Sequence, residues 1–226
     1  MRTRPKILIG TMAFVLAMSA GADVITCYTT NTKARINNLG TAGNNFYVGQ
    51  YNTSWVDRSY LLFELPDLAA GQTLVSATLR IFAVTTFAVT NDADLYHMQD
   101  LNHTGDLIPG LDGDYNAGTP TLAMEGLGTP TMETNRYYEV DVLSLIQSDY
   151  TLDSSDNRIA AFRIQLDNDD GKIHGGITRR YLFQSGWSIT TNHPELVLET
   201  IPEPASVSLF LLSGLGIVLV RHRLRS

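Results

Sequence analysis

Apolar and polar residues alternate with a period of two over much of this chain. From Val75 to Ala83 the odd positions are apolar, whereas Ser76, Thr78 and Arg80 occupy even positions. Successive side chains of a β-strand point to opposite faces, so this alternation predicts a strand that buries one face. The same alternation predicts further strands within residues 61–65, 138–142, 159–166 and 196–198.

Helical patterns are nearly absent between the two ends of the chain. We expect only a single helical turn there, at Val142–Gln147. Many strands joined by turn-rich segments, without interleaved helices, favour an all-β fold. The sequence therefore predicts an antiparallel β-sandwich of jelly-roll type over residues 23–200. This length suffices for one hydrophobic core, and the single cysteine, Cys27, excludes a disulfide within the chain.

Residues 1–22 have the composition of a secretory signal peptide. Arg2, Arg4 and Lys6 form a positive start, and residues 7–18 form an apolar stretch too short to span a bilayer. Small residues follow, and we expect cleavage after Ala22. The pattern predicts export through the inner membrane.

The C-terminal end combines three different patterns. Pro202-Glu203-Pro204 is a stiff, extended tripeptide, because each proline fixes φ and disfavours helix in the residue before it. Residues 205–220 form an uncharged apolar run, which predicts a transmembrane helix shorter than the ~20 residues of a comfortable span. A basic cluster then ends the chain and favours a cytoplasmic location for that end: Arg221, Arg223 and Arg225.

The order of these three elements resembles the PEP-CTERM sorting signal of bacterial surface proteins. The resemblance covers residues 201–226 and implies that a membrane-embedded exosortase recognises Pro202-Glu203-Pro204 and processes the chain there. It also implies a membrane-anchored state before sorting, and a location at the cell surface or in the extracellular matrix afterwards. The alternative is an ordinary C-terminal membrane anchor behind a rigid stalk.

A second resemblance begins near residue 57. Four segments are similar, in this order, to landmarks of the DNRLRE-type domain: 57–66 (DRSYLLFELP), 70–81 (AGQTLVSATLRI), 141–147 (DVLSLIQ) and 193–199 (HPELVLE). The resemblance implies a β-sandwich of jelly-roll type, and some relatives act as carbohydrate-binding modules. Relatives usually carry tryptophans in the region of residues 100–134, whereas this chain has none there, so their use for sugar stacking does not carry over.

The part of the chain between the two ends is strongly acidic. All 23 Asp and Glu lie between residues 23 and 203, together with only 10 of the 16 Lys and Arg. This part therefore carries a formal net charge of −13. Such a surface repels DNA, RNA and anionic lipid, so we expect no nucleic-acid partner.

Motifs for catalysis are missing from the sequence. The histidines form no H-E-x-x-H motif, and neither a G-x-S-x-G elbow nor a paired Cys/His spacing occurs. We therefore expect no catalytic residues and no enzyme activity. A polysaccharide-acting enzyme is the most distant alternative.

One acidic turn is a candidate metal site. Asp167, Asp169 and Asp170 stand beside Gly171, and crowded oxygen ligands next to a glycine turn suit Ca²⁺. The spacing departs from an EF-hand loop, because Gly171 stands where a third ligand is required. A hairpin turn without metal is the favoured interpretation, and we expect no other cofactor.

Aromatic residues near loops are candidates for glycan binding. Trp55 and Trp187 lie near predicted turns, and Arg179 and Arg180 are able to meet an acidic sugar through charge-assisted hydrogen bonds. The alternative is that each tryptophan plugs an end of the sandwich.

These patterns predict an exported bacterial surface or matrix protein with a structural or adhesive role. Its expected partners are an exosortase and the membrane, which the C-terminal helix enters. The main alternative is a non-catalytic carbohydrate-binding module for an acidic polysaccharide.

Overall fold

Antiparallel strands make up almost all of the regular structure, which confirms the predicted all-β fold. The computed structural model describes residues 22–29, 35–39, 41–43, 45–98, 120–152, 158–173, 175, 177–184 and 191–203. No helix within these ranges is long and apolar enough to cross a membrane, and the predicted span at 205–220 lies outside them. The elements are β1 (Asp23–Tyr28), β2 (Arg35–Asn37), β3 (Ala42–Gly43), β4 (Phe46–Tyr51), β5 (Trp55–Glu64), β6 (Gln72–Phe87), β7 (Ala93–Met98), β8 (Pro120–Gly128), β9 (Arg136–Asp141), α1 (Leu143–Leu152), β10 (Ile159–Leu166), β11 (Arg179–Phe183) and β12 (Glu195–Pro202).

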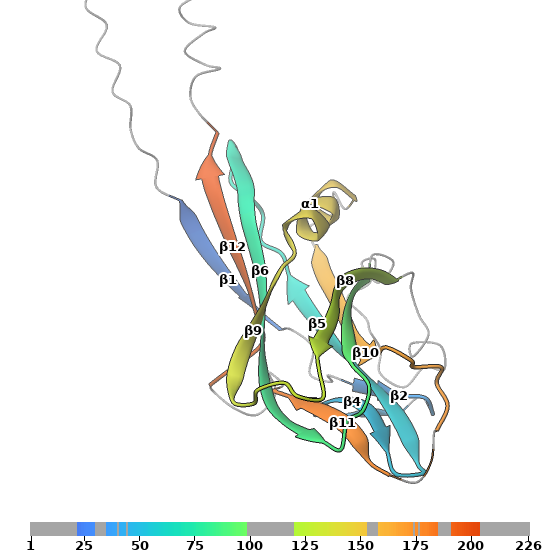
Figure 1. Ribbon diagram of the computed structural model, residues 1–226. Coiled ribbons are helices and arrows are strands. Elements are labelled where there is room, and N and C mark those ends of the chain that lie inside the picture. The colour runs from blue at the N-terminus through green and yellow to red at the C-terminus, as the bar shows by residue number, and fades with distance from the viewer. Residues whose placement is uncertain are drawn as a thin grey trace, which may run out of the picture.

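The strands form one open sheet whose order differs from their order in the sequence (Figure 1). The order is β1-β12-β6-β11-β4-β5-β10-β7-β8, while β9 pairs with β6, and β2 pairs with β5 and β3. The first and last strands, β1 and β12, lie side by side and run antiparallel. The chain therefore enters and leaves the sheet at neighbouring positions.

One strand, β5, connects two groups of strands. Trp55–Asp57 pairs with β4, and Ser59–Glu64 pairs with β10. Strands on both sides of this connection contribute to one apolar cluster. Its largest fully buried side chains are Phe46, Leu79, Ile81, Tyr181 and Phe183 from the first group, and Leu61, Phe63, Leu95, Leu127 and Phe162 from β5 and the second group.

The predicted alternation in β6 is confirmed except at its start. The odd positions from Ala77 to Ala83 are almost fully buried. Val75 is 38% exposed, whereas Leu74 takes the inward position, so the prediction for Val75 is wrong. A β-bulge is the reason, because the pairing with β12 passes from Ser76 directly to Leu74 and leaves one extra residue.

The predicted one-sided burial of β10 is also wrong. Ala160 and Phe162 face the large apolar cluster as expected. On the other face Ala161 belongs to a second cluster with Leu62 and Met98, and Arg163 is buried as well. A strand between β5 and β7 is thus covered on both faces, so its alternation does not mark a solvent-exposed side.

The helix α1 is longer than the single turn that the sequence predicts. Asp141 Oδ1 accepts a hydrogen bond from the N–H of Leu143 at 3.0 Å, which satisfies a free donor at the helix start. The buried side of the helix includes Ile146 and Asp149. Asp149 Oδ2 lies 2.9 Å from Nε2 of the buried His97 in β7. The sequence pattern underestimates the length of α1 because the inward position 149 holds an aspartate, paired with His97, instead of an apolar residue.

Gly49 lets β4 and β11 approach closely. Its φ of 118° lies in a region that L side chains rarely adopt. An added Cβ atom would lie 2.4 Å from the carbonyl oxygen of Arg179. Glycine is therefore required for the backbone conformation and for the space between the strands.

Replacing Gly49 with alanine is expected to lower the free energy of unfolding by at least about 2 kcal/mol, since backbone strain alone contributes roughly 1–3 kcal/mol. Gly175→Ala is the matched control, because Gly175 has a φ of 82° but no described atom lies within 4 Å of its added Cβ. Urea unfolding of both variants measures the difference. Equal losses would show that the close approach of the two strands does not require Gly49.

Candidate functional site

A cleft of about 570 Å³ opens beside the ends of β4 and β10 and the start of β11. This volume lies in the range of small-molecule binding sites. Val56, Val89 and Leu166 supply its apolar lining. Charged side chains of both signs surround them: Asp167, Asp169, Asp170, Lys172 and Arg179.

The turn after β10 forms one wall of the cleft and contains the predicted calcium residues. The side chain of Asp169 is buried, and its Oδ2 accepts a hydrogen bond from Arg58 Nε at 2.7 Å. Its Oδ1 accepts a hydrogen bond from the N–H of Gly171 at 2.8 Å. Asp170 Oδ1 accepts one from the N–H of Lys172 at 2.9 Å. Both aspartates therefore brace a turn, in the way that Asp commonly does.

This bracing limits what the turn offers to a cation. Both carboxylate oxygens of Asp169 are engaged. Of the three predicted calcium residues, only Asp167 has an exposed carboxylate without a hydrogen bond to another described residue. Within the described ranges, no three His, Cys, Asp or Glu side chains are grouped so that they could hold a metal ion. A calcium ion would have to displace the Arg58 ion pair, and Ca²⁺ binding stays a prediction.

Two side-chain amides, one buried and one half-buried, hold the walls of the cleft in place. Gln50 Nε2 donates hydrogen bonds to the carbonyl oxygens of Asn52 at 2.5 Å and Gly175 at 2.7 Å. Asn38 Nδ2 donates to the carbonyl oxygen of Gly171 at 2.9 Å. These bonds tie the loop before β11 and the turn after β10 to the sheet, so the cleft is preformed.

Arg179 and Arg180 do not share one surface. They are consecutive residues at the start of β11, and neighbouring residues of a strand point to opposite faces. The Arg179 side chain lines the cleft, and no hydrogen bond or ion pair joins it to another described residue. Arg180 points to the face opposite the apolar cluster, where it lies over Tyr47. The two predicted glycan-binding arginines thus serve two separate surfaces.

Arg180 belongs to an aromatic strip, which we define as Tyr47, Tyr51, Trp55, Phe87 and Arg180. Its Cζ lies 3.8 Å from the ring centroid of Tyr47, 4.6 Å from that of Tyr51 and 5.3 Å from that of Phe87. Trp55 stacks on Tyr51 with centroids 5.1 Å apart and 24° between the ring planes. The structure therefore brings together Trp55 and Arg180, two of the residues predicted to bind glycans.

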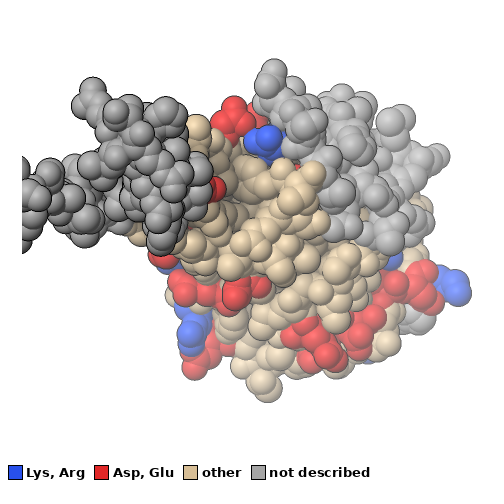
Figure 2. All heavy atoms as spheres, turned by 90° about the horizontal axis from the view of Figure 1, so that it is seen from above, with Lys and Arg blue, Asp and Glu red and all other residues tan. Residues whose placement is uncertain are grey.

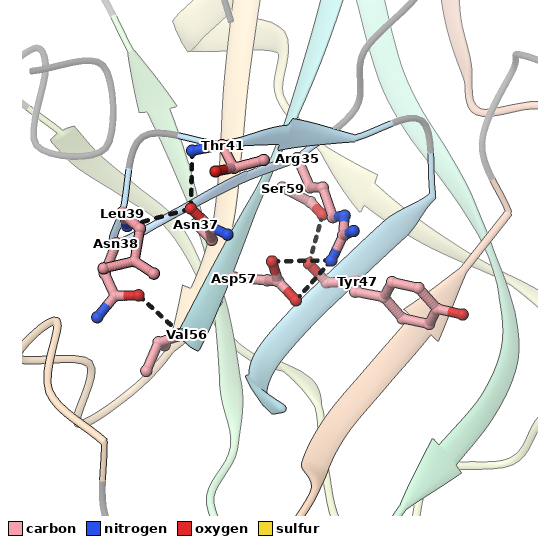
Figure 3. A network of polar contacts seen from close by, with 9 residues as sticks. All are labelled: Arg35, Asn37, Asn38, Leu39, Thr41, Tyr47, Val56, Asp57 and Ser59. Atoms are coloured by element: carbon pink, nitrogen blue, oxygen red, sulfur yellow. Dashed lines mark hydrogen bonds and ion pairs between the residues drawn. The ribbon is translucent and has the colours of Figure 1, made fainter. Parts of the chain in front are cut away.

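An ion pair supports this strip (Figure 3). Arg35 Nη1 donates to both carboxylate oxygens of the buried Asp57, at 3.0 and 2.9 Å. The Arg35 guanidinium also lies 5.4 Å from the ring centroid of Tyr47. Ser59 Oγ donates to the carbonyl oxygen of Tyr47 at 2.7 Å. Tyr47 is thus fixed through both its ring and its backbone.

Three further predicted site residues are described and line neither surface. Ala22 is exposed just before β1, Pro202 ends β12, and Glu203 is exposed after it. The others lie outside the described residues: Trp187, Pro204, Arg221, Arg223 and Arg225.

Sequence reasoning missed several residues that shape the site, namely Arg35, Gln50 and Asp57. Each contacts partners that are distant in sequence or belong to the backbone. A signal was present for one of them. Asp57 and Arg58 are adjacent charges that precede the apolar residues 60–63, and charges within a buried strand require partners.

The described surface is more acidic than basic. Seen from above the view of Figure 1, Asp and Glu cover more of the visible face than Lys and Arg (Figure 2). This distribution fits the net charge of −13 for residues 23–203. Arg179 in the cleft and Arg180 in the strip therefore provide local positive charge within an acidic surrounding.

No protein-family model matches the chain, and a search of curated proteins finds no match either. The resemblances to the PEP-CTERM signal and to the DNRLRE-type domain therefore stay predictions.

The ion pair between Arg35 and Asp57 leads to a prediction about how the stability of the fold depends on pH. Burial raises the pKa of Asp57 to about 6, although Arg35 and Arg180 partly counteract this shift. The usual aspartate pKa in an unfolded chain is about 3.9, so the folded state binds the proton more tightly. The contribution of Asp57 to stability is therefore fully present below about pH 4 and is lost as pH rises through about 6.

The Asp57→Asn variant lacks this titration, so the difference between the unfolding free energies of wild type and variant isolates the effect of Asp57. We expect the wild-type value minus the variant value to fall by an amount on the order of 3 kcal/mol between pH 4 and pH 7. Urea unfolding at several pH values measures this difference. A difference that rises with pH would show that the Arg35 ion pair outweighs burial and holds the carboxylate ionised.

Proposed function

We propose that this chain is an exported bacterial surface or matrix protein with a structural or adhesive role, sorted by an exosortase at Pro202-Glu203-Pro204. The observation that carries the proposal is the pairing of the first and last strands. Asp23 lies opposite Thr200, so the predicted signal peptide and the predicted sorting segment leave the sheet at the same end (Figure 1). The signal peptide, before its predicted cleavage, and the predicted helix at 205–220 are then able to reach the same membrane while the body stays on its outer side.

We further infer that the body is a β-sandwich of jelly-roll type. Strands from both sides of β5 share one apolar cluster, as two packed layers require. An isolated bridge between Thr29 and Phe63 brings the chain after β1 next to β5, although these strands lie far apart in the strand order. Both observations support a sheet that folds back over its own core.

Glycan binding is the second candidate function, and the aromatic strip favours it. Trp55 and Tyr51 offer large, amphipathic ring surfaces of the kind that bury well in interfaces. Arg180 lies among these rings and is able to meet a carboxylate through charge-assisted hydrogen bonds. The cleft, by comparison, mixes basic and acidic side chains. The strip is therefore the better candidate for an acidic polysaccharide.

Replacing Pro202, Glu203 and Pro204 together with alanine is expected to leave the full-length protein in the membrane, because the segment that the exosortase would recognise is lost. Mass spectrometry of the C-terminus in surface and membrane fractions measures the outcome in a bacterium that contains the sorting enzyme. Pro130→Ala, at an exposed proline in the turn after β8, is the control. Equal surface release of wild type and triple variant would contradict the proposed sorting.

Trp55→Ala is expected to weaken binding to a uronic-acid polysaccharide at least about tenfold, which corresponds to about 1.4 kcal/mol. The physical reason is the loss of the ring that stacks on Tyr51. Affinity electrophoresis with a polyuronate and with a neutral glucan measures the effect. Leu122→Ala removes an exposed apolar side chain from β8 and is the control. Unchanged polyuronate binding by a Trp55→Ala protein that still unfolds cooperatively would remove the strip from consideration.

A further inference from the structure

The predicted sorting tripeptide begins inside the sheet. Pro202 is the last residue of β12 and pairs with Gln72 of β6. The N–H of the next residue, Glu203, donates a hydrogen bond to the carbonyl oxygen of Gly71 at 2.5 Å. Hence no linker separates the folded body from the tripeptide.

The side chain of Gln72 joins three segments at this corner of the sheet. Its Oε1 accepts a hydrogen bond from the N–H of Ala69 at 3.1 Å, within the turn before β6. Its Nε2 donates to Asp23 Oδ2 at 2.8 Å. The predicted cleavage after Ala22 would make Asp23 the first residue of the mature chain. Gln72 therefore links the first residue of the predicted mature chain to the turn before β6. Through its pairing with Pro202 it also contacts the end of β12.

An enzyme that processes a peptide segment must reach its backbone, and backbone groups paired in a sheet are shielded. Strand ends open locally at a much smaller free-energy cost than the whole fold. The described bonds at this corner therefore set how often the tripeptide is reachable.

We propose that Asp23, Gly71, Gln72, Pro202 and Glu203 form a latch that shields the sorting tripeptide, so that the end of β12 must separate from β6 before the sorting enzyme engages it. This inference rests on the proposed function. The latch adds a regulatory step, because sorting speed then depends on the stability of the sheet end rather than on the tripeptide alone.

A reversible lock tests the latch in the full-length protein. Ile201 and Thr73 are directly paired across β12 and β6. Paired residues of antiparallel strands have Cα atoms about 4.5–5.5 Å apart, which suits a disulfide. A Thr73→Cys, Ile201→Cys protein should therefore cross-link after export. We expect it to keep its C-terminal segment while oxidised, and to lose that segment at the wild-type rate or faster once a reductant is added.

The matched control places the same cross-link farther from the sheet end, with Thr78→Cys and Val197→Cys, which are also directly paired. This protein should be processed at the wild-type rate while oxidised. A complementary variant, Gln72→Ala, removes the bonds to Ala69 and Asp23. It should be processed about fivefold faster, which corresponds to about 1 kcal/mol for the hydrogen bonding lost. Pulse–chase labelling with mass spectrometry of the C-terminus measures all rates.

The outcomes separate the latch from the proposed sorting. If the oxidised Thr73→Cys, Ile201→Cys protein is processed as fast as its Thr78→Cys, Val197→Cys control, the latch is overturned. An unchanged rate for Gln72→Ala overturns it as well. If the latch variants fail in this way while the triple alanine variant at Pro202–Pro204 stays unprocessed, only the latch is wrong. If the triple alanine variant is processed like the wild type, both the sorting proposal and the latch are wrong.

Discussion

The continuity of β5 is the constraint on which the rest of the structure depends. One end of this strand pairs with β4 and the other with β10, so a single segment joins the two groups of strands that share the apolar cluster. Every residue from Val56 to Phe63 is buried. Because a buried charge without a partner is strongly unfavourable, polar residues in this stretch must bring their partners with them.

Two charged residues in β5, Asp57 and Arg58, organise both candidate surfaces for this reason. Arg58 pairs with Asp169 and so holds the turn that forms one wall of the cleft. Asp57 points to the opposite face and pairs with Arg35, which lies over Tyr47 of the aromatic strip. Removing one member of a buried ion pair typically lowers the free energy of unfolding by about 3–5 kcal/mol. The two ion pairs therefore attach both surfaces firmly to the core.

The sheet also couples the two ends of the chain. β12 lies between β1 and β6, and its final residues share a corner with the start of β1. The segments that would direct export and sorting are therefore attached to the same edge region of one fold. Residues 23–203 carry a net charge of −13, which an anionic membrane surface would repel.

Local patterns in the sequence determined the fold class, the inward positions of β6 from Ala77 onward and the turn after β10. These features follow from strand alternation and turn chemistry, which act between neighbouring residues. The tertiary structure decided what depends on distant partners. The bulge at Val75 arises from pairing with β12, and the extension of α1 from the contact of Asp149 with His97. The position of Arg180 between Tyr47 and Phe87 arises from the pairing of β11 with β4 and β6. A sequence pattern records which positions are apolar, but it does not record which distant residue will satisfy a buried polar group.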